Sequence, residues 1–359
     1  MRVSALFCLT LAAVGLAKPE GQKPLRSEIC LNGVWRFMPA VGSALREPLP
    51  DEKAWGLIRV PGCFAGWGVP GIVKRGEGEV WSEFNESVGR GWYERTVLIP
   101  KDWAGQAIIL EFQWLGTDAL VFVNGKKCGF VPFPGGEIDI TDFVQPGQNA
   151  TIRVLVVAAS DERQVAEMLD GKIVNHNLRR GSQWACGITG EVFIRSRPKG
   201  AHINDVFIQT SVRRKELKVT VELANVAQHG EANFVARLLN EKGKEERQFR
   251  SRVKLKPLRK QVVNLVWKWS TPRLWDFRQP NLYTLHLRVS GAGIDDEYRQ
   301  TFGFREFWVE GKRFFLNGKE IRLRSACLPD EWTIYSGAVE YIDGVLDGLM
   351  KVGFNAGKQ

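Results

Sequence analysis

The chain has 359 residues, of which 44% are hydrophobic and 25% are charged, and its formal net charge is +10. This length accommodates two or three domains with their own cores, and the composition excludes a disordered or fibrous protein. The positive charge raises the question of a nucleic-acid partner, which depends on where the charges fall.

Met1 to Ala17 form the first distinct segment. One arginine precedes a twelve-residue apolar run from Ala5 to Leu16, and small residues occupy Gly15 and Ala17. Twelve residues span about 18 Å as a helix, whereas the hydrocarbon core of a bilayer is about 30 Å thick. The segment therefore predicts a cleaved signal peptide and export to the periplasm or the extracellular space. No later segment of the sequence is a candidate for a membrane span.

The cysteines and histidines do not indicate a metal site. After cleavage of the signal peptide the cysteines are Cys30, Cys63, Cys128, Cys186 and Cys327, an odd number without a C-x-x-C pair. This spacing favours buried free thiols, with at most one or two bridges, over a disulfide framework or a zinc site. The four histidines are far apart and lack metal-ligand spacing. No metal and no cofactor is expected.

Residues 30–303 show mostly the two-residue periodicity of strands. Asn124-Gly125 and Asn317-Gly318 each separate apolar runs and predict two-residue hairpin turns. Short runs rich in Val, Ile, Leu and Phe lie between the turns, for example at 107–112, 151–157 and 261–267. Many short strands with few helices predict a mainly β protein built from sandwiches.

The strands fall into two blocks. Residues 24–198 are rich in glycine, carry eight of the 13 tryptophans and have the size of a jelly roll with long loops. A polar turn, Ser196 to Asp205, contains the boundary to a second block. This block, residues 199–303, has the size of an immunoglobulin-like sandwich.

The pattern changes after Gly303. Residues 321–328 are a strand candidate, Val339 to Met350 place apolar residues on one helical stripe, and Phe354 to Ala356 resemble the start of another strand. Strand, helix and strand in this order predict the βαβ unit of a parallel sheet or barrel.

The basic segment Arg247 to Lys260 does not favour nucleic acid. Its cationic residues Arg250, Arg252 and Lys254 alternate with residues of the opposite face such as Phe249 and Val253. This alternation predicts one half-buried strand with a solvated side. An acidic polysaccharide remains the alternative partner for these charges.

Particular phrases resemble a known family. "LNGVWRF", "YERTVLIPKDWAGQAIILEF", "ALVFVNGKKCGF", "EIDITDFVQPGQN" and "GITGEVFI" resemble the sugar-binding domain of family 2 glycoside hydrolases, which include β-galactosidases, β-glucuronidases and β-mannosidases. "PNLYTLHLRV" and "FGFREFWVEGKRFFLNGKEIRLRS" are similar to that family's immunoglobulin-like domain and the start of its catalytic barrel.

The resemblance implies a jelly-roll sugar-binding domain, an immunoglobulin-like domain and the start of a (β/α)8 barrel at residues 304–359. The family phrase "GFNA" normally continues through an apolar residue to an arginine, whereas Gly357, Lys358 and Gln359 depart from it. A barrel of this kind needs roughly 250 residues, and 55 follow Phe304. We therefore expect a truncated barrel.

No catalytic residue is assigned. Retaining glycosidases need two carboxyl groups about 5 Å apart, and the resemblance places both on later barrel strands. The neighbouring pairs Asp295–Asp296 and Glu245–Glu246 are interpreted as solvated loop residues.

Five residues are candidates for carbohydrate contact. Asp330 and Glu331 follow the first barrel strand, on the rim where active sites form, and Arg324 lies nearby. In "NLRRGSQWACGITGEV", Gly181 stands where some family members carry an aspartate that reaches the active site. Arg180 and Trp184 remain candidates there, because an indole face is an apolar platform for a sugar ring, although packing explains most tryptophans.

These observations support two functions. The first is the non-catalytic N-terminal part of an exported family 2 glycoside hydrolase, inactive by itself. The alternative is a secreted stand-alone carbohydrate-binding protein, against which the apolar helix from Val339 to Met350 argues. In both cases the expected partner is a β-glycoside carbohydrate, and no nucleic acid is expected.

Overall fold

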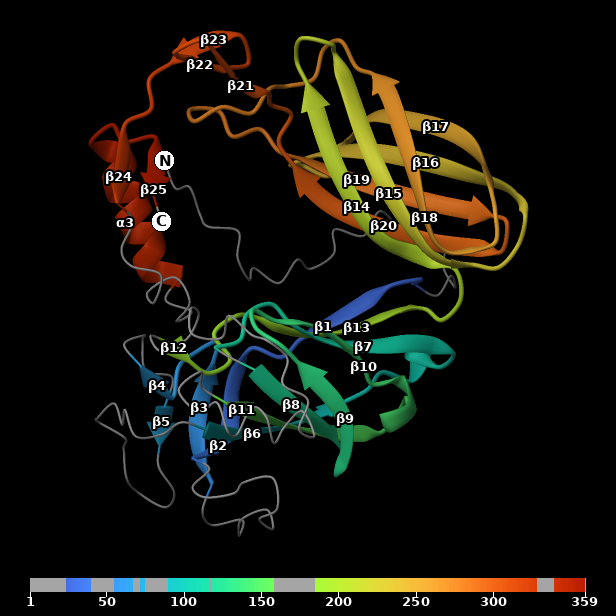
Figure 1. Cartoon of the computed structure of the whole chain (residues 1–359), viewed down its shortest axis with the longest axis vertical. Helices are drawn as coiled ribbons and strands as arrows, with labels where there is room; N and C mark the ends of the chain where they lie inside the picture. The colour runs from blue at the N-terminus through green and yellow to red at the C-terminus, as the bar shows by residue number, and fades with distance from the viewer. Residues whose placement is uncertain are drawn as a thin grey trace. The chain divides into compact units, whose positions relative to one another are not determined.

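The computed structural model (Figure 1) describes residues 24–39, 55–66, 72–74, 90–116, 118–157, 185–327 and 339–358. The chain is mainly β in these ranges, as predicted. Contacts divide it into two compact units, one built chiefly from Ser27–Ser196 and one chiefly from Arg197–Ala326. The predicted signal peptide, Met1 to Ala17, lies outside the described residues.

The first unit contains two large antiparallel sheets. One has the strand order β1-β13-β7-β10 and the other has the order β5-β3-β2-β6-β11-β8-β9, while β12 pairs with β4. The strands are β1 (Ser27–Cys30), β2 (Gly33–Pro39), β3 (Gly56–Val60), β4 (Ala65–Gly66), β5 (Ile72–Lys74), β6 (Arg90–Leu98), β7 (Gln106–Phe112), β8 (Asp118–Val123), β9 (Lys126–Val131), β10 (Gly136–Asp139), β11 (Asn149–Val157), β12 (Ala185–Cys186) and β13 (Val192–Pro198). Two short 3-10 helices, η2 (Lys101–Trp103) and η3 (Thr141–Phe143), lie between strands.

Aromatic residues contribute to the largely aliphatic core of the first unit, in agreement with packing as the expected role of most tryptophans. Trp35 and Trp103 are buried, and the rings of Phe37 and Tyr93 meet edge to face with centroids 5.1 Å apart. Residues of both large sheets belong to this one hydrophobic cluster. Along β11, Ile152, Val154 and Val156 face this shared core, whereas Leu155 and Val157 belong to a second cluster on the opposite face.

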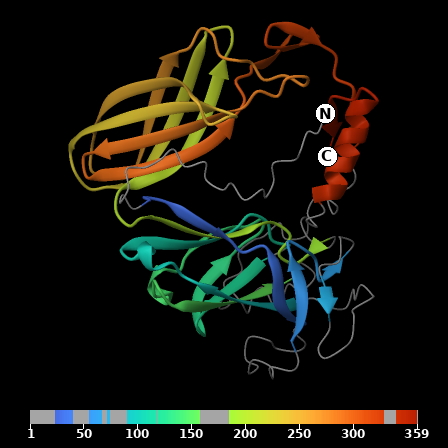
Figure 2. The same cartoon turned by 180° about the vertical axis from the view of Figure 1, so that it is seen from behind.

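The second unit is a sandwich of three strands and four strands. Its two sheets, visible in Figure 2, have the strand orders β14-β15-β18 and β17-β16-β19-β20. The strands are β14 (His202–Ser211), β15 (Glu216–Val226), β16 (Gly230–Asn240), β17 (Glu245–Leu255), β18 (Leu258–Lys268), β19 (Tyr283–Gly291) and β20 (Ile294–Phe302). Residues 247–255 of the basic segment lie on the edge strand β17, with Phe249 and Val253 half-buried and Arg250 and Arg252 exposed, as the alternation predicted, whereas its last residues begin β18.

The core of the second unit extends beyond its last strand. Phe304 is fully buried, and its ring lies 5.3 Å from that of Trp269, which in turn contacts Tyr283 at 4.8 Å. The segment that leaves β20 is therefore part of this hydrophobic core.

Both Asn-Gly turns form as predicted, and each asparagine also braces a neighbouring segment. The φ angles of Asn124 and Gly125 are 49° and 78°, and those of Asn317 and Gly318 are 53° and 86°, which is the conformation that two-residue hairpins require. Asn124 exchanges a pair of hydrogen bonds with the backbone of Thr151, and its side-chain amide donates to the carbonyl of Phe143 at 2.9 Å.

Strand, helix and strand come after the second sandwich. A small sheet of β21 (Phe307–Glu310), β22 (Arg313–Leu316) and β23 (Lys319–Ile321) precedes β24 (Ser325–Cys327), α3 (Val339–Lys351) and β25 (Ala356–Lys358). Strands β24 and β25 pair with each other. The predicted helix is confirmed, whereas the strand expected at 321–328 is divided, because residues 322–324 are not in a strand.

The two acidic pairs interpreted as solvated loop residues lie on strands, so the loop assignment was wrong, although Asp295, Glu245 and Glu246 are exposed as expected. Asp296 belongs to β20 and is fully buried, where it accepts hydrogen bonds from Nε of Arg26 at 2.9 Å and from the N–H of Ile203 at 2.7 Å. Glu245 and Glu246 begin β17. The local sequence resembles a turn, but Arg26, 270 residues away, neutralises the buried carboxylate, and only the tertiary fold brings it there.

The prediction of buried free thiols holds for part of the set. Cys63 is buried and free, Cys186 is buried, and Cys128 is free and half-buried. Cys30 is exposed, contrary to the prediction, because β1 is an edge strand and its alternation turns Cys30 outward. The side chain of Cys327 lies outside the part of the chain that the structure describes.

Candidate functional site

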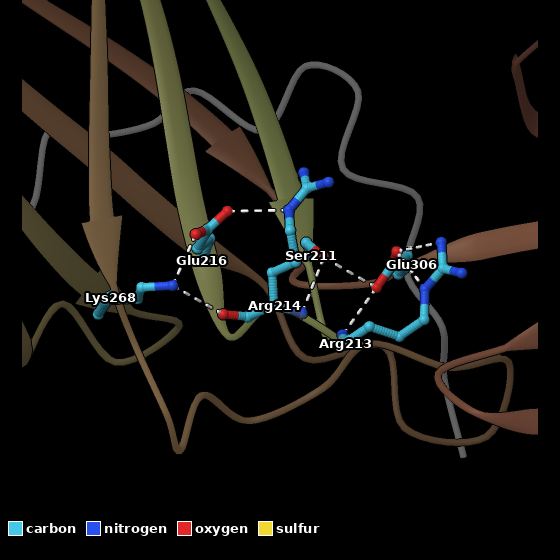
Figure 3. Close-up of polar contacts among 6 residues, drawn as sticks. All are labelled: Ser211, Arg213, Arg214, Glu216, Lys268 and Glu306. Carbon is cyan, nitrogen blue, oxygen red and sulfur yellow. Dashed lines mark hydrogen bonds and ion pairs between the residues drawn. The ribbon is translucent and has the colours of Figure 1, made fainter.

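A group of polar residues gathers at one end of the second sandwich (Figure 3). We call it the junction cluster, because it lies where the chain leaves the sandwich for β21. Ser211 ends β14, Glu216 begins β15, and Lys268 ends β18. The full cluster is Ser211, Arg213, Arg214, Glu216, Lys268 and Glu306.

Glu306 is the centre of one half of the junction cluster. Its carboxylate accepts hydrogen bonds from the backbone N–H of Arg213 at 2.9 Å, from Nε of Arg213 at 2.8 Å and from Oγ of Ser211 at 3.2 Å. Burial opposes ionisation, but these donors, led by the Arg213 guanidinium, hold the pKa of Glu306 below its ordinary value. Glu306 is therefore a fixed anion and is unsuited to act as a general acid.

Glu216 is the centre of the other half. Its carboxylate accepts hydrogen bonds from Nζ of Lys268 at 2.7 Å and from Nε of Arg214 at 2.9 Å, and these two donors lower its pKa. Ser211 connects the halves, because its Oγ donates to Glu306 and accepts from the N–H of Arg214 at 3.1 Å.

The junction cluster holds the segment that comes after the sandwich. The guanidinium of Arg213 lies 4.3 Å from the ring centroid of Trp308 on β21, and Trp308 stacks on Phe315 of β22 at 5.3 Å. The backbone N–H of Asn317 donates to the carbonyl of Glu306, and Oδ1 of Asn317 accepts from the N–H of Glu306, each at 2.9 Å. The side-chain amide of Asn317 donates to the carbonyl of Trp275. These contacts orient the hairpin of β22 and β23 against the end of the sandwich, so the cluster positions structure rather than performing chemistry.

One predicted contact residue, Arg324, lies in the described chain, and the other four, Arg180, Trp184, Asp330 and Glu331, lie outside it. Arg324 is exposed and immediately precedes β24. Its backbone N–H donates to Oδ1 of Asn355 at 2.8 Å, and its carbonyl accepts from the N–H of Asn355 at 3.1 Å. Its backbone thus fixes the approach of β25 to β24 and leaves the side chain exposed.

The described residues next to Trp184 form a closely packed frame. Gly187 has φ of 151°, and a Cβ atom there would lie 2.5 Å from the carbonyl oxygen of Gly62 and 2.9 Å from the hydroxyl of Tyr93, so only glycine fits. Burial raises the pKa of the Cys186 thiol to about 12, and it raises that of Cys63 further. These thiols stay protonated and are structural rather than nucleophilic.

The structure also brings together carboxylates that the sequence did not pair. Glu111 on β7 lies directly opposite Glu137 on β10, and an ion pair joins Glu111 to Arg195. Burial, opposed by the charge of Arg195 and reinforced by that of Glu137, raises the pKa of Glu111. The guanidinium holds Glu111 as part of a surface row of charges on the sheet, and only the strand register reveals this arrangement.

Within the described ranges, no group of three or more His, Cys, Asp or Glu residues has an arrangement suited to a metal ion. In the same ranges, no helix has the length and apolar character needed to cross a bilayer.

Comparison with known sequences identifies both sandwiches. The profile described as "Glycosyl hydrolases family 2, sugar binding domain" matches residues 80–198, and the profile "Glycosyl hydrolases family 2" matches residues 201–305. Together they cover more than half of the chain. The chain belongs to glycosyl hydrolases family 2. Its first sandwich is the sugar-binding domain of the family, and its second is the immunoglobulin-like domain.

Family 2 relatives are longer than this chain. A β-galactosidase of Priestia megaterium is 30% identical over 214 residues, which are 57% of this chain and 19% of the relative. A β-glucuronidase of Paenibacillus borealis is 28% identical over 316 residues, or 80% of this chain and 47% of the relative. The chain thus spans less than half the length of both relatives.

Solved structures agree on the fold. A family 2 member from Bacteroides cellulosilyticus superposes with a TM-score of 0.69 and 22% identity, covering 92% of this chain and 44% of that protein. At this identity the likeness extends to the fold alone.

Proposed function

We propose that this chain supplies the non-catalytic sugar-binding and immunoglobulin-like domains of an exported glycoside hydrolase that cleaves O-glycosidic bonds. The two family 2 domains follow one another in the chain, and the relatives named above are a β-galactosidase and a β-glucuronidase. That succession of domains is the observation on which the proposal depends. The carbohydrate ligand is a β-glycoside.

The chemistry of the described carboxylates supports a non-catalytic role. A retaining glycosidase requires one protonatable carboxyl group and one free carboxylate, about 5 Å apart around a sugar. Glu306 and Glu216 are held as anions by arginine and lysine, and Asp296 is enclosed by Arg26 and the N–H of Ile203. These groups stabilise the fold and offer neither a proton nor a nucleophile.

The proposal assigns the junction cluster a mechanical role. A catalytic barrel acts only if its loops are held to within a fraction of an ångström of their productive positions. The ion pair of Glu306 with Arg213 and the stacking of Arg213 on Trp308 restrain the first structure after the immunoglobulin-like domain. This role is the one that best fits a cluster of fixed charges at the end of a sandwich.

Activity and binding measurements test the proposal. The purified chain is expected to leave aryl β-galactosides, β-glucuronides and β-mannosides intact while binding a β-glycoside in calorimetric titration. Trp184→Ala and Arg180→Ala should weaken that binding, whereas Trp35→Phe, in the core, should change stability instead. Hydrolysis of any of these substrates by the pure chain would contradict the non-catalytic assignment.

Export is tested separately. Expression with residues 1–17 in a secreting host should yield a mature protein that begins at or near Lys18. Retention of Met1 on the secreted or cytosolic product would contradict a cleaved signal peptide. A protein that binds sugar, lacks activity and never associates with a catalytic domain would favour the alternative, a secreted stand-alone binding protein.

A further inference from the structure

The outer face of the four-stranded sheet β17-β16-β19-β20 is rich in arginine. The strand registers place Arg250 of β17 opposite Val235 of β16, which lies opposite Arg288 of β19. In the adjoining row, Arg237 of β16 lies opposite His286 of β19, which lies opposite Arg299 of β20. Each of the four strands thus contributes one arginine, and we call Arg237, Arg250, Arg288 and Arg299 the arginine band.

The arginine band crosses the sheet at right angles to its strands. Neighbouring strands lie about 4.8 Å apart, so the four guanidinium groups are spread over about 14 Å in two adjoining rows. Arg252 and Lys254 continue the positive charge along β17, where both are exposed. The result is a shallow line of cations rather than a pocket for one small anion.

The acidic residues of this face leave part of the band available. Six cationic side chains face outward here together with four carboxylates, those of Glu231, Glu245, Asp295 and Glu297. Arg237 pairs with Glu245 at 2.6 Å, Arg288 pairs with Asp295, and Glu297 bonds to Nε2 of His286 at 3.1 Å. The pairs of Arg237 and Arg288 are accessible to solvent and contribute at most about 1 kcal/mol each, so a ligand anion is able to replace them, whereas the pair of Glu297 with His286 is largely buried.

Two members of the band have no acidic partner among the described residues. The guanidinium of Arg250 donates to Oε1 of Gln248 at 3.1 Å and 3.3 Å, and Arg299 is exposed. Arginine presents two parallel donors that match a carboxylate or sulfate group. The unpaired positions therefore have the chemistry of an oxyanion site.

The outward-facing residues restrict the class of ligand. Along these four strands no Phe, Tyr or Trp points outward, since Phe234, Phe249, Tyr283, Tyr298 and Phe302 all lie on the inner face. Single-stranded nucleic acids bind largely by stacking on such rings, and a flat sheet offers no element that enters the groove of duplex DNA. A linear polymer with an anionic group on successive units matches the band better.

We propose that the arginine band of the immunoglobulin-like domain binds a linear acidic polysaccharide, with the sugar chain lying across the strands. The ligand carries carboxylate or sulfate groups, and Arg250 and Arg299 contact it first. This surface goes beyond the function proposed above and does not depend on it, because it requires neither hydrolysis nor the candidate residues of the sugar-binding domain.

Binding of the full chain to immobilised polysaccharides tests the proposal. Alginate supplies carboxylates, dextran sulfate supplies sulfates, and neutral dextran is the blank. The chain should bind at least one of the charged polymers and not the blank, and binding should weaken as salt is raised. Arg250→Gln combined with Arg299→Gln should weaken binding about tenfold, and Arg250→Lys with Arg299→Lys should lie between.

A matched control separates this site from general charge. Lys199→Gln combined with Lys312→Gln removes the same charge from two exposed positions elsewhere and should bind like the parent. Because Arg250 and Arg299 have no ion pair within the described chain, the variants should unfold at the same denaturant concentration as the parent. If the double variant is less stable than the parent, the binding of each single variant is measured instead. Equal loss in the control, no binding, or tighter arginine-dependent binding to DNA would each overturn the proposal.

Discussion

Glu306 shows how one carboxylate can connect a finished domain to the next segment of the chain. It accepts three hydrogen bonds from Ser211 and Arg213, and its backbone is paired with Asn317. The residue is a short distance from Phe304 in sequence, so the buried ring and the bound carboxylate fix the same segment from two sides.

We expect Glu306→Gln to lower the free energy of unfolding of the immunoglobulin-like domain by about 2 kcal/mol at pH 7, since hydrogen bonds to a charged group are lost. The exposed Glu310→Gln should change it by less than about 0.5 kcal/mol. Urea titration followed by tryptophan fluorescence measures both. Equal effects would show that the junction cluster adds nothing to stability.

The pH dependence of this effect arises from the lowered pKa of Glu306. A depressed folded pKa contributes stability that is present above the ordinary value of 4.5 and is lost as the pH falls through the folded pKa. The difference between parent and Glu306→Gln should therefore shrink in acid. A difference that stays constant from pH 7 to pH 3 would contradict ionisation as its source.

Glu111 should behave in the opposite way. Burial and the charge of Glu137 raise its pKa against the effect of Arg195, so the folded state binds its proton more tightly than the unfolded state. Stability from this group is fully present below 4.5 and is lost as the pH rises through the raised folded pKa. Glu111→Gln should remove this fall in the free energy of unfolding with rising pH, and Glu137→Gln should make the fall smaller. If the melting temperature of the Glu111→Gln variant depends on pH as that of the parent does, this assignment is refuted.

At the scale of the element, the two Asn-Gly turns share one design. In each turn the asparagine has a positive φ angle. Its backbone N–H donates to the carbonyl of a partner residue, and its Oδ1 accepts from the N–H of the same residue. Its side-chain amide donates to the carbonyl of another residue. The partners are Thr151 and Phe143 in the first turn and Glu306 and Trp275 in the second. Each turn therefore reverses the direction of the chain and also holds a neighbouring segment in place through hydrogen bonds.

This design predicts that Asn317→Gly is costly although glycine suits the φ angle. Loss of two side-chain hydrogen bonds should reduce stability by about 2 kcal/mol, whereas Gly318→Ala should cost about 1 kcal/mol through backbone strain. Chemical denaturation of the two variants measures the difference. If Asn317→Gly were neutral, the role of the asparagine would be limited to its φ angle.

At the scale of the whole molecule, the exposed apolar residues of the last segment are a solubility liability. Leu346, Met350 and Val352 are 39%, 49% and 71% exposed. Exposed apolar side chains that lie close together favour association.

A chain that ends at residue 323 should therefore give more soluble protein than the full chain. A chain that ends at 303 should be less stable than both, because it loses Phe304 from the core and Glu306 from the junction cluster. Soluble yield and melting temperature of the three chains decide this. A more stable 303-residue chain would show that the segment from 304 is not part of the domain.

The sequence by itself determined the mainly β class, both hairpin turns, the helix from Val339 and the family. These features depend on local chemistry: a two-residue alternation, the positive φ of Asn-Gly and a 3.6-residue apolar stripe. The family phrases likewise are runs of consecutive residues, so they can be recognised without knowledge of the fold.

Only the tertiary structure decided the environment of individual charges. Asp296 resembles a turn residue until Arg26, from the other end of the chain, meets it in the core, and Cys30 resembles a buried thiol until β1 takes an edge position. The Glu111–Glu137 pair and the arginine band depend on strand register, and Glu306 depends on the contact of the segment after β20 with Ser211 and Arg213. Their physical cause is the same: desolvation and Coulomb interactions act across space between residues far apart in sequence, and a linear pattern does not encode those distances.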